Sequence, residues 1–314
     1  NDFGIEGAAE NAIALDNQKQ AQKFHQKLHN EILKAQTQKD EIRQGQLEVV
    51  IVGAGATGVE LAAELHKATR EMAAYGLDKI NPDKDIKISL IEASDRLLPA
   101  LPKRMSFSVD RELKKLNVNL FLNERVTNVS EKGIHTHTGR FIPSALVVWA
   151  AGIKAPEFLK KIGLKVNGIN QIIVKSTLQS IDDDSIFAFG DCAACPIKPG
   201  VQELVPPRAQ SAHQQASLLA KTMKRLVVGK KHNLPQYSYK DYGSLVNLGR
   251  YSTVGNLMGS LTGGNMFIEG FVARIMYLML YQMHLMALHG MTVVSLRLIA
   301  KFITRRTETH VKLH

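Results

Sequence analysis

One stretch, from Leu47 to Leu65, limits the fold of this chain more than any other. It reads LEVVIVGAGATGVELAAEL, so an uninterrupted apolar run precedes a glycine-rich turn and an apolar helix. A strand without polar alternation is typical of a parallel sheet that is covered on both faces. Residues 49–52 are therefore predicted to form a buried strand, and a helix is predicted to begin near Ala56.

The turn contains Gly53, Gly55 and Gly58 at the spacing G-x-G-x-x-G. The first glycine permits a tight turn, the second lets pyrophosphate approach the backbone, and the third lets helix and strand pack closely. The helix N-terminus offers unpaired N–H groups and a partial positive charge to an anion. The spacing alone is weak evidence, but its strand–turn–helix context predicts a dinucleotide site. The alternative is a glycine turn that binds nothing.

An acidic residue ends the next predicted strand, which covers residues 86–91 and leads into Glu92. A carboxylate at this place can accept hydrogen bonds from ribose hydroxyls and repel a 2′-phosphate, which favours NADH over NADPH. Glu92 follows the glycines at a longer interval than the usual distance of about twenty residues. Arg96 lies close enough in sequence to weaken the preference. The alternative is a surface glutamate at a strand end.

Small residues follow another predicted buried strand over residues 146–149. This strand runs into Ala151 and Gly152, where the lack of large side chains lets backbone approach a dinucleotide.

An amphipathic helix is predicted earlier, over residues 17–37, because its apolar residues recur at steps of three and four.

A predicted strand over 186–189 delivers a second glycine and carboxylate, Gly190 and Asp191. A carboxylate here can accept a hydrogen bond from a ribityl or ribose hydroxyl.

Cys192 and Cys195 follow as C-x-x-C, which permits a redox dithiol. No basic residue flanks the pair, so two structural thiols are favoured. Two cysteines are too few for a disulfide framework, which indicates a reducing compartment, and they form a poor zinc site, so no metal is predicted.

A helix predicted over residues 208–227 begins with an unusually polar patch. Gln210 and Gln214 are four residues apart and share a face, and His213 is three residues from Gln210. Amides and a neutral imidazole are groups that orient a carbonyl. The alternative is a solvated helix start.

The last eighty residues change in character. Residues 237–268 are glycine-rich with short apolar runs, which predicts a small antiparallel sheet. Residues 275–296 contain no Lys, Arg, Asp or Glu and carry a methionine stripe. Their length permits a transmembrane helix, but the polar residues and Gly290 within and the basic apolar tail after them favour a helix that lies in the membrane interface. A Met-rich core helix or a dimer helix is the alternative, so a homodimer stays open.

The formal charge of the chain is +11. Such an excess indicates a polyanionic partner, which is nucleic acid, an anionic membrane surface or an acidic substrate. The alternative is a basic surface that has no polyanionic partner. Because basic residues follow the apolar stretch on one predicted helix face, we expect the anionic membrane surface and no nucleic acid.

Several segments together resemble type II NADH:quinone oxidoreductases, in particular those of Gram-negative bacteria. The segments are GAGATGVELAAELH, VVWAAGIKAPEF, FAFGDCA, PPRAQSAHQQ and MHLMALHG. The resemblance implies an α/β fold with two Rossmann-type nucleotide-binding domains, one for FAD and one for NADH. It also implies C-terminal amphipathic membrane-anchoring helices and a monotopic place on the cytoplasmic face of the bacterial inner membrane.

The resemblance also implies roles on the NADH side. The three glycines match the loop that holds the NADH pyrophosphate, and Glu92 matches the acid that binds the adenosine ribose. Ala151 and Gly152 match the small segment near the nicotinamide. Glu60 matches a carboxylate near nicotinamide and flavin that positions substrate or handles protons.

On the FAD side, Gly190 and Asp191 match the second FAD motif of that family. Gln210, His213 and Gln214 match the quinone-site helix beside the isoalloxazine. The family's first FAD fingerprint, an N-terminal G-x-G-x-x-G, has no counterpart in this sequence, so we expect the FAD domain to be incomplete at its N-terminus.

Four segments are predicted on this basis. Residues 1–44 are a remnant of the FAD-binding domain, and residues 45–153 form the NADH-binding domain. Residues 154–236 return to the FAD-binding domain with the quinone-site helix, and residues 237–314 form the small sheet and the membrane anchor.

The implied activity is hydride transfer from NADH to FAD and then two-electron transfer to a membrane quinone, without proton pumping. The nearest enzyme alternative is a soluble pyridine-nucleotide disulfide reductase that uses the C-x-x-C pair. A non-catalytic NAD-binding module is the alternative from another class, since the first FAD fingerprint is missing.

Overall fold

The computed structural model describes residues 1–74, 76–230, 232–249, 252–257 and 266–304. The chain forms two compact units. Unit one consists of residues 1–152 with the C-terminal residues from 243 onward, apart from 258–264, and unit two consists mainly of residues 153–242. The basic residues expected beyond position 304 lie outside the described residues.

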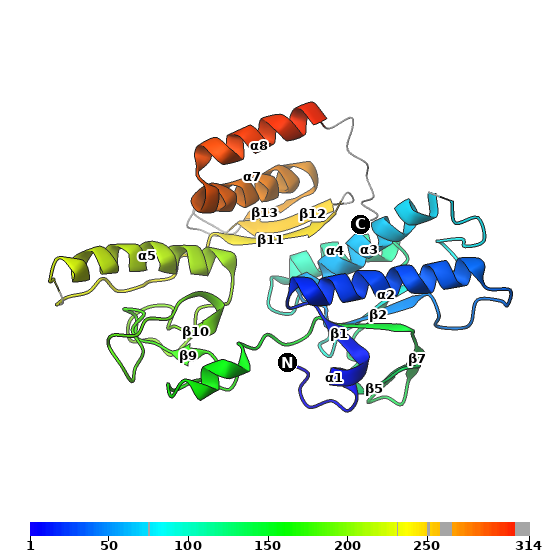
Figure 1. Ribbon diagram of the computed structural model, residues 1–314, viewed down its shortest axis with the longest axis horizontal. Helices are drawn as coiled ribbons and strands as arrows, with labels where there is room; N and C mark the ends of the chain where they lie inside the picture. The colour runs from blue at the N-terminus through cyan, green and yellow to red at the C-terminus, as the bar shows by residue number, and fades with distance from the viewer. Residues whose placement is uncertain (75, 231, 250–251, 258–265, 305–314) are drawn as a thin grey trace. The chain divides into compact units, whose positions relative to one another are not determined.

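A five-stranded parallel sheet forms the centre of unit one (Figure 1). Its spatial order is β1 (Ala12–Ala14), β8 (Leu146–Trp149), β2 (Glu48–Val52), β3 (Lys87–Ile91) and β4 (Asn119–Phe121). Every residue of β2 is buried, as the uninterrupted apolar run predicts. Trp149, the last residue of β8, pairs with Val52, the last residue of β2.

Three helices cover one face of this sheet. They are α2 (Gln18–Thr37), α3 (Ala56–Ala74) and α4 (Lys103–Lys115). Their apolar residues share a core with Val49 and Ile51 of β2. The predicted helix over 17–37 is confirmed as α2, whose N-terminus is capped where the side chain of Asn17 accepts a hydrogen bond from the Gln20 N–H at 3.0 Å.

A second, antiparallel sheet covers the other face. It consists of β5 (Val126–Ser130), β6 (Gly133–Thr136) and β7 (Phe141–Pro143). Its residues share a core with Val50 and Val52 of β2, together with the short helix α1 (Ala8–Asn11). Successive residues of β2 thus meet different layers, and this explains why its sequence shows no polar alternation.

The predicted antiparallel sheet near the C-terminus is confirmed. It contains β11 (Gly243–Leu248), β12 (Ser252–Leu257) and β13 (Met266–Glu269). Two helices follow, α7 (Gly270–His289) and α8 (Met291–Thr304). Gly290 separates them and ends α7 with a φ of 81° and a ψ of 157°, a backbone conformation that favours glycine.

Unit two is built mostly from irregular segments. Its elements are η1 (Glu157–Lys161), β9 (Ile172–Ile173), η2 (Gly190–Cys192), β10 (Ala193–Ala194) and α5 (Ala209–Val227). The strand predicted over 186–189 is wrong, because only Phe187 forms a bridge, to Gln179. The Ser180 N–H donates to the Ile186 carbonyl at 2.8 Å, so the segment closes a tight local loop instead of extending a sheet.

The predicted domain boundaries stay predictions. Within unit one, β1 belongs to the stretch 1–44 that we assigned to an FAD-domain remnant. Its residue Ile13 pairs with Val148 of β8, which makes β1 an edge strand of the same sheet as the glycine-rich turn.

Candidate functional site

In the turn between β2 and α3, the surrounding backbone constrains Gly53 and Gly58 but leaves space at Gly55. Gly53 has a φ of 103°, and a Cβ added there would lie 2.8 Å from Ala151. A Cβ added to Gly58 would collide with the carbonyl oxygen of Gly53. A Cβ added to Gly55 would meet no described atom within 4 Å. The open space at Gly55, at the start of α3, is where an anionic group can approach the backbone.

The side chain of Glu92 closes one edge of this turn. Its Oε2 accepts a hydrogen bond from the Ala54 N–H at 2.8 Å, and its Oε1 accepts from the Ser94 N–H at 2.9 Å. Each carboxylate oxygen retains capacity to accept another hydrogen bond. Arg96 donates to the carbonyl oxygens of Leu101 and Pro99, at 2.8 and 2.6 Å, and so lies against its own loop.

The small residues after β8 lie beside the same turn. The Ala150 N–H donates to the Val52 carbonyl at 2.8 Å, which extends the sheet by one residue and places Ala151 against Gly53. Gly152 has a φ of 75°, and a Cβ added there would meet the ring of Phe3. The carboxyl ends of β2, β3 and β8 therefore lie side by side at one edge of the sheet, which is the edge where parallel α/β sheets bind ligands.

Glu60 faces the C-terminal sheet. Its Oε1 accepts a hydrogen bond from the Asn247 N–H of β11 at 2.9 Å. Burial raises the pKa of Glu60 above its ordinary value; the Asn247 N–H opposes this and Glu64 adds to it. Burial, and then the charge of Glu60, also raise the pKa of Tyr277 on α7. Glu60 thus joins the glycine-turn helix to β11, and its charge acts on Tyr277 of α7.

In unit two, Gly190 and Asp191 form the short helix η2 beside the start of α5. Gly190 has a φ of 70°, and a Cβ added there would lie 3.4 Å from Ala212. The Gly190 N–H donates to the side chain of Gln215 at 2.6 Å. The Asp191 carbonyl accepts from the side chain of Gln171 at 2.9 Å, and the Asp191 carboxylate is exposed.

The polar start of α5 holds the chain segment just before β11. The Tyr242 N–H donates to Gln210 Oε1 at 3.1 Å. Gln214 accepts from the Lys240 N–H at 3.1 Å and donates to the Lys240 carbonyl at 2.8 Å. The side chain of His213 is exposed. Both amides therefore have a structural task, and of the three residues it is His213 that faces solvent.

The two cysteines are free thiols with different surroundings. Cys195 is fully buried, and burial raises its pKa to about 12. Cys192 is partly exposed, and its Sγ donates to the Phe189 carbonyl at 3.2 Å. A thiol with so high a pKa is a poor nucleophile, which disfavours a dithiol mechanism. No group of three or more metal-ligating side chains occurs in the described part of the chain.

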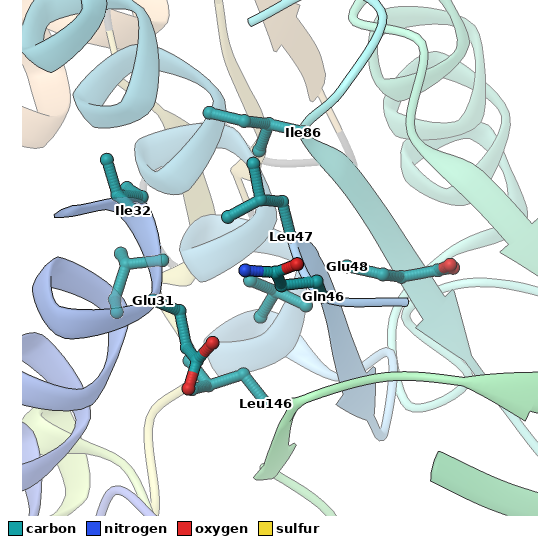
Figure 2. Close-up of a pocket in the computed structure, with 9 residues that line it drawn as sticks. Glu31, Ile32, Gln46, Leu47, Glu48, Ile86 and Leu146 are labelled. Atoms are coloured by element: carbon teal, nitrogen blue, oxygen red, sulfur yellow. The ribbon is translucent and has the colours of Figure 1, made fainter. Parts of the chain in front are cut away.

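A small cavity lies at the opposite end of the sheet (Figure 2). It measures about 10 Å³ and lies between α2 and the beginnings of β2 and β8, next to Leu47 and Leu146. Ligands of parallel sheets bind at the carboxyl ends of the strands, so this cavity is a packing defect of the core and not a site.

Within unit one the structure brings together Gly53, Gly55, Gly58, Glu92, Ala151 and Gly152, and within unit two Gly190 and Asp191 lie beside α5. Sequence reasoning missed Gln215, which is only 1% exposed and binds Gly190. Its signal was present, since Ser211, Gln215 and Leu219 recur every four residues and form the buried face of α5. The contact of Asn247 with Glu60 had no sequence signal, because the two residues are 187 positions apart in the chain.

Comparisons with known proteins agree with this arrangement. Residues 1–216 match the family described as pyridine nucleotide-disulphide oxidoreductase. The whole chain is 39% identical to a type II NADH:quinone oxidoreductase of Haemophilus influenzae and covers 72% of it. A protein of the same description from Staphylococcus aureus is 27% identical over 83% of the chain, which spans 64% of that relative.

Solved structures show the same fold. NDH2 of Plasmodium falciparum, solved in complex with NADH, matches with a TM-score of 0.80 and 21% identity, over 99% of this chain and 77% of that one. A ferredoxin reductase from Rhodopseudomonas palustris matches with a TM-score of 0.61 and 18% identity, over 82% of this chain and 55% of that one.

Proposed function

This chain belongs to the type II NADH:quinone oxidoreductase family, and from that premise we propose that it oxidises NADH and delivers the electrons, by way of FAD, to a membrane quinone. The predicted family and α/β fold are confirmed, as is the class of enzyme. The observation that supports the proposal for this chain is the geometry of the glycine turn. Backbone atoms leave no room for a side chain at Gly53 or Gly58, whereas the space beside Gly55 is free for a ligand, and Glu92 lies at the edge of the turn.

We propose that NADH binds across the carboxyl ends of β2, β3 and β8. The backbone N–H groups at the start of α3 hold its pyrophosphate, since Gly55 leaves that approach open. Glu92 accepts hydrogen bonds from the adenosine ribose while its own bonds to Ala54 and Ser94 fix its orientation. Ala151 and Gly152 let the nicotinamide half lie against backbone. The protein's contribution is orientation of the reacting carbon.

The second nucleotide site is proposed for unit two. The residues that fit it are Gly190 and Asp191. The side chain of Gln215 accepts a hydrogen bond from the Gly190 N–H and so fixes this part of the backbone. The exposed carboxylate of Asp191 can accept hydrogen bonds from hydroxyl groups. When bound, FAD supplies the two-electron chemistry between nicotinamide and quinone.

The polar start of α5 is proposed as the quinone end of the reaction. Gln210 and Gln214 are anchored to residues 240–242, so they present a fixed helix face. His213 is the exposed group on this stretch and is suited to donate a hydrogen bond to a quinone carbonyl. Glu60 is proposed to act indirectly, through its hydrogen bond with β11, either in positioning or in proton handling.

Attachment to the cytoplasmic face of the membrane is proposed for α7 and α8. By length and composition α7 could cross a membrane, and very little of it is buried in the protein. Gly290 breaks the apolar stretch, and Arg297 and Lys301 follow on α8, which favours helices that lie in the interface of an anionic leaflet. Neither helix carries a carboxylate, so we propose no proton path and no pumping.

Steady-state oxidation of NADH by a soluble quinone tests the proposal, with Glu92→Ala as the variant. We expect the KM for NADH to rise about tenfold or more, since a hydrogen bond to a charged group contributes roughly 1.5–3 kcal/mol. The KM for quinone should not change. Glu131→Ala, at an exposed position of the same unit, is the control. An unchanged KM for NADH in the Glu92 variant would contradict the ribose assignment, and no NADH oxidation by the wild-type protein would contradict the function.

A further inference from the structure

A shallow hollow lies on unit one between α4 and β13, away from the glycine turn. Its volume is about 400 Å³. Its walls combine basic, aromatic and polar side chains: Lys103, Arg104, Phe107, Ser108, Arg111, Phe267 and Glu269. None of these residues takes part in the sites described above.

The hollow has more positive than negative charge. Its one carboxylate, Glu269, lies 3.6 Å from the guanidinium of Arg111 and accepts a hydrogen bond from Ser108 at 3.2 Å. In the described part of the chain no carboxylate lies within ion-pair distance of Lys103 or Arg104. Two cationic side chains therefore remain to meet an anion, and Arg104 is held over the ring of Phe267, 5.1 Å from its centroid.

Exposed aromatic side chains lie at the rim of the hollow. Phe107 is 70% exposed and falls on the same face of α4 as Lys103 and Arg111, at steps of four residues. Directly after Glu269 the chain enters α7, where Phe271 is 76% exposed. The basic hollow is thus continuous, along the chain, with the apolar surface of α7.

We infer that the hollow between α4 and β13 binds the phosphate of an anionic membrane lipid, with Phe107 inserted among the acyl chains beside it. The inference rests on the proposed membrane attachment of α7 and α8. It adds a second point of contact that holds the nucleotide-binding unit itself to the bilayer.

A lipid fits this surface better than a free anion does. A soluble phosphate needs only the cations and would leave Phe107 in water. A lipid headgroup meets Lys103 and Arg104 while its chains cover the aromatic rim, the combination found where proteins lie in a membrane interface. Each basic group near an anionic leaflet strengthens binding by about fivefold.

Vesicle binding of the full chain tests the inference. The vesicles are phosphatidylcholine alone and an equimolar mixture of phosphatidylcholine with phosphatidylglycerol. We expect Lys103→Gln with Arg104→Gln to weaken binding to the mixed vesicles about thirty-fold, at about fivefold per charge, and to leave binding to neutral vesicles unchanged. Phe107→Ser should weaken binding to both. The matched control is Lys19→Gln with Lys23→Gln, which removes two exposed charges from α2.

The outcomes separate the two proposals. If the wild-type chain binds neither kind of vesicle, the proposed attachment of α7 and α8 fails. If it binds both and the α4 double variant behaves like the α2 control, the inference fails alone. Two other results overturn it: inorganic phosphate that binds through Lys103 and Arg104 without vesicles being affected, and a dimer in solution that Phe107→Ser dissociates. Thermal unfolding of each variant verifies that the fold is retained.

Discussion

Gly55 and Gly58 occupy the same turn, but the fold constrains Gly58, whereas for Gly55 we propose that the constraint comes from a bound ligand. A side chain at Gly58 would overlap the carbonyl of Gly53, whereas one at Gly55 would project into open space. The first constraint belongs to the packing of α3 on β2, and the second appears only when a pyrophosphate is present.

Alanine substitutions separate these two constraints. We expect Gly58→Ala to lower the free energy of unfolding by about 1–3 kcal/mol, because backbone must move to admit the Cβ. Gly55→Ala should leave the midpoint of thermal unfolding unchanged and raise the KM for NADH at least tenfold. Thermal denaturation and NADH titration measure the two effects. Equal loss of stability in both variants would show that the turn has no dedicated ligand position.

The pKa of Glu60 gives a prediction about pH. Burial raises this pKa in the folded protein, so the folded state binds the proton more tightly than the unfolded state does. The resulting contribution to stability is complete below the ordinary pKa of glutamate, about 4.3, and is lost as pH rises through the raised value. Glu60→Gln cannot ionise, so its stability relative to the wild-type protein should increase with pH across that window.

Chemical denaturation at a series of pH values measures the difference between the Glu60 variant and the wild-type protein. Glu131→Gln is the control, because Glu131 is exposed and lies in the same unit. A difference that stays constant with pH, or one that the Glu131 variant reproduces, would contradict the raised pKa.

Among the elements, α5 shows how one helix serves two segments. Its polar face holds residues 240–242 through Gln210 and Gln214, and its buried face holds η2 through Gln215. A helix with both tasks fixes the spacing between η2 and the chain that leads to β11. The amide of Gln215 is the part of this arrangement that water cannot replace, since it is buried.

Replacement of Gln215 by leucine leaves the Gly190 N–H without its partner. We expect a loss of roughly 1–3 kcal/mol in the free energy of unfolding, the cost of an unsatisfied buried donor. FAD retention, measured by absorbance after gel filtration, should fall with it. Gln202→Leu, at an exposed position of unit two, is the control and should change neither quantity. Full stability in the Gln215 variant would show that η2 does not depend on this bond.

The elements also show what sequence could predict. The parallel core was predictable because β2 and α3 carry their packing in local patterns: an unbroken apolar run and glycines at fixed spacing. The segment 186–189 was mispredicted because its apolar residues resemble a strand, while its hydrogen bonds are decided by the loop at 178–180. Gln215 could have been found from helix periodicity, but the contact of Glu60 with Asn247 depends on tertiary packing alone.

On the scale of the whole molecule, exposed apolar side chains are concentrated on the C-terminal helices. Of the exposed large apolar residues, many lie on α7 and α8, including Leu296, Ile299 and Phe302. A soluble protein seldom exposes so continuous an apolar surface without a partner to cover it. Arg297 and Lys301 accompany it on α8, as expected for a helix that lies on an anionic membrane.

A triple variant of α8 tests this attachment without removing any buried contact. Leu296→Ser, Ile299→Ser and Phe302→Ser replace only exposed side chains. Each such side chain contributes about 1.5–3 kcal/mol when it enters an apolar phase, so membrane binding should fall more than a hundredfold. Oxidation of NADH by ferricyanide should continue at the wild-type rate. Retention of the triple variant on membranes washed without detergent would contradict the proposal.

The position of Trp149 has a practical consequence. It is the only tryptophan of the chain, it is buried, and it ends β8 opposite Val52, one residue before the glycine turn. Indole emission overlaps the absorption band of reduced nicotinamide, so energy transfer from this donor should report occupancy of the turn. The protein therefore carries its own fluorophore beside the proposed coenzyme site, so we expect that dissociation constants for NADH can be measured on unlabelled protein before any turnover begins.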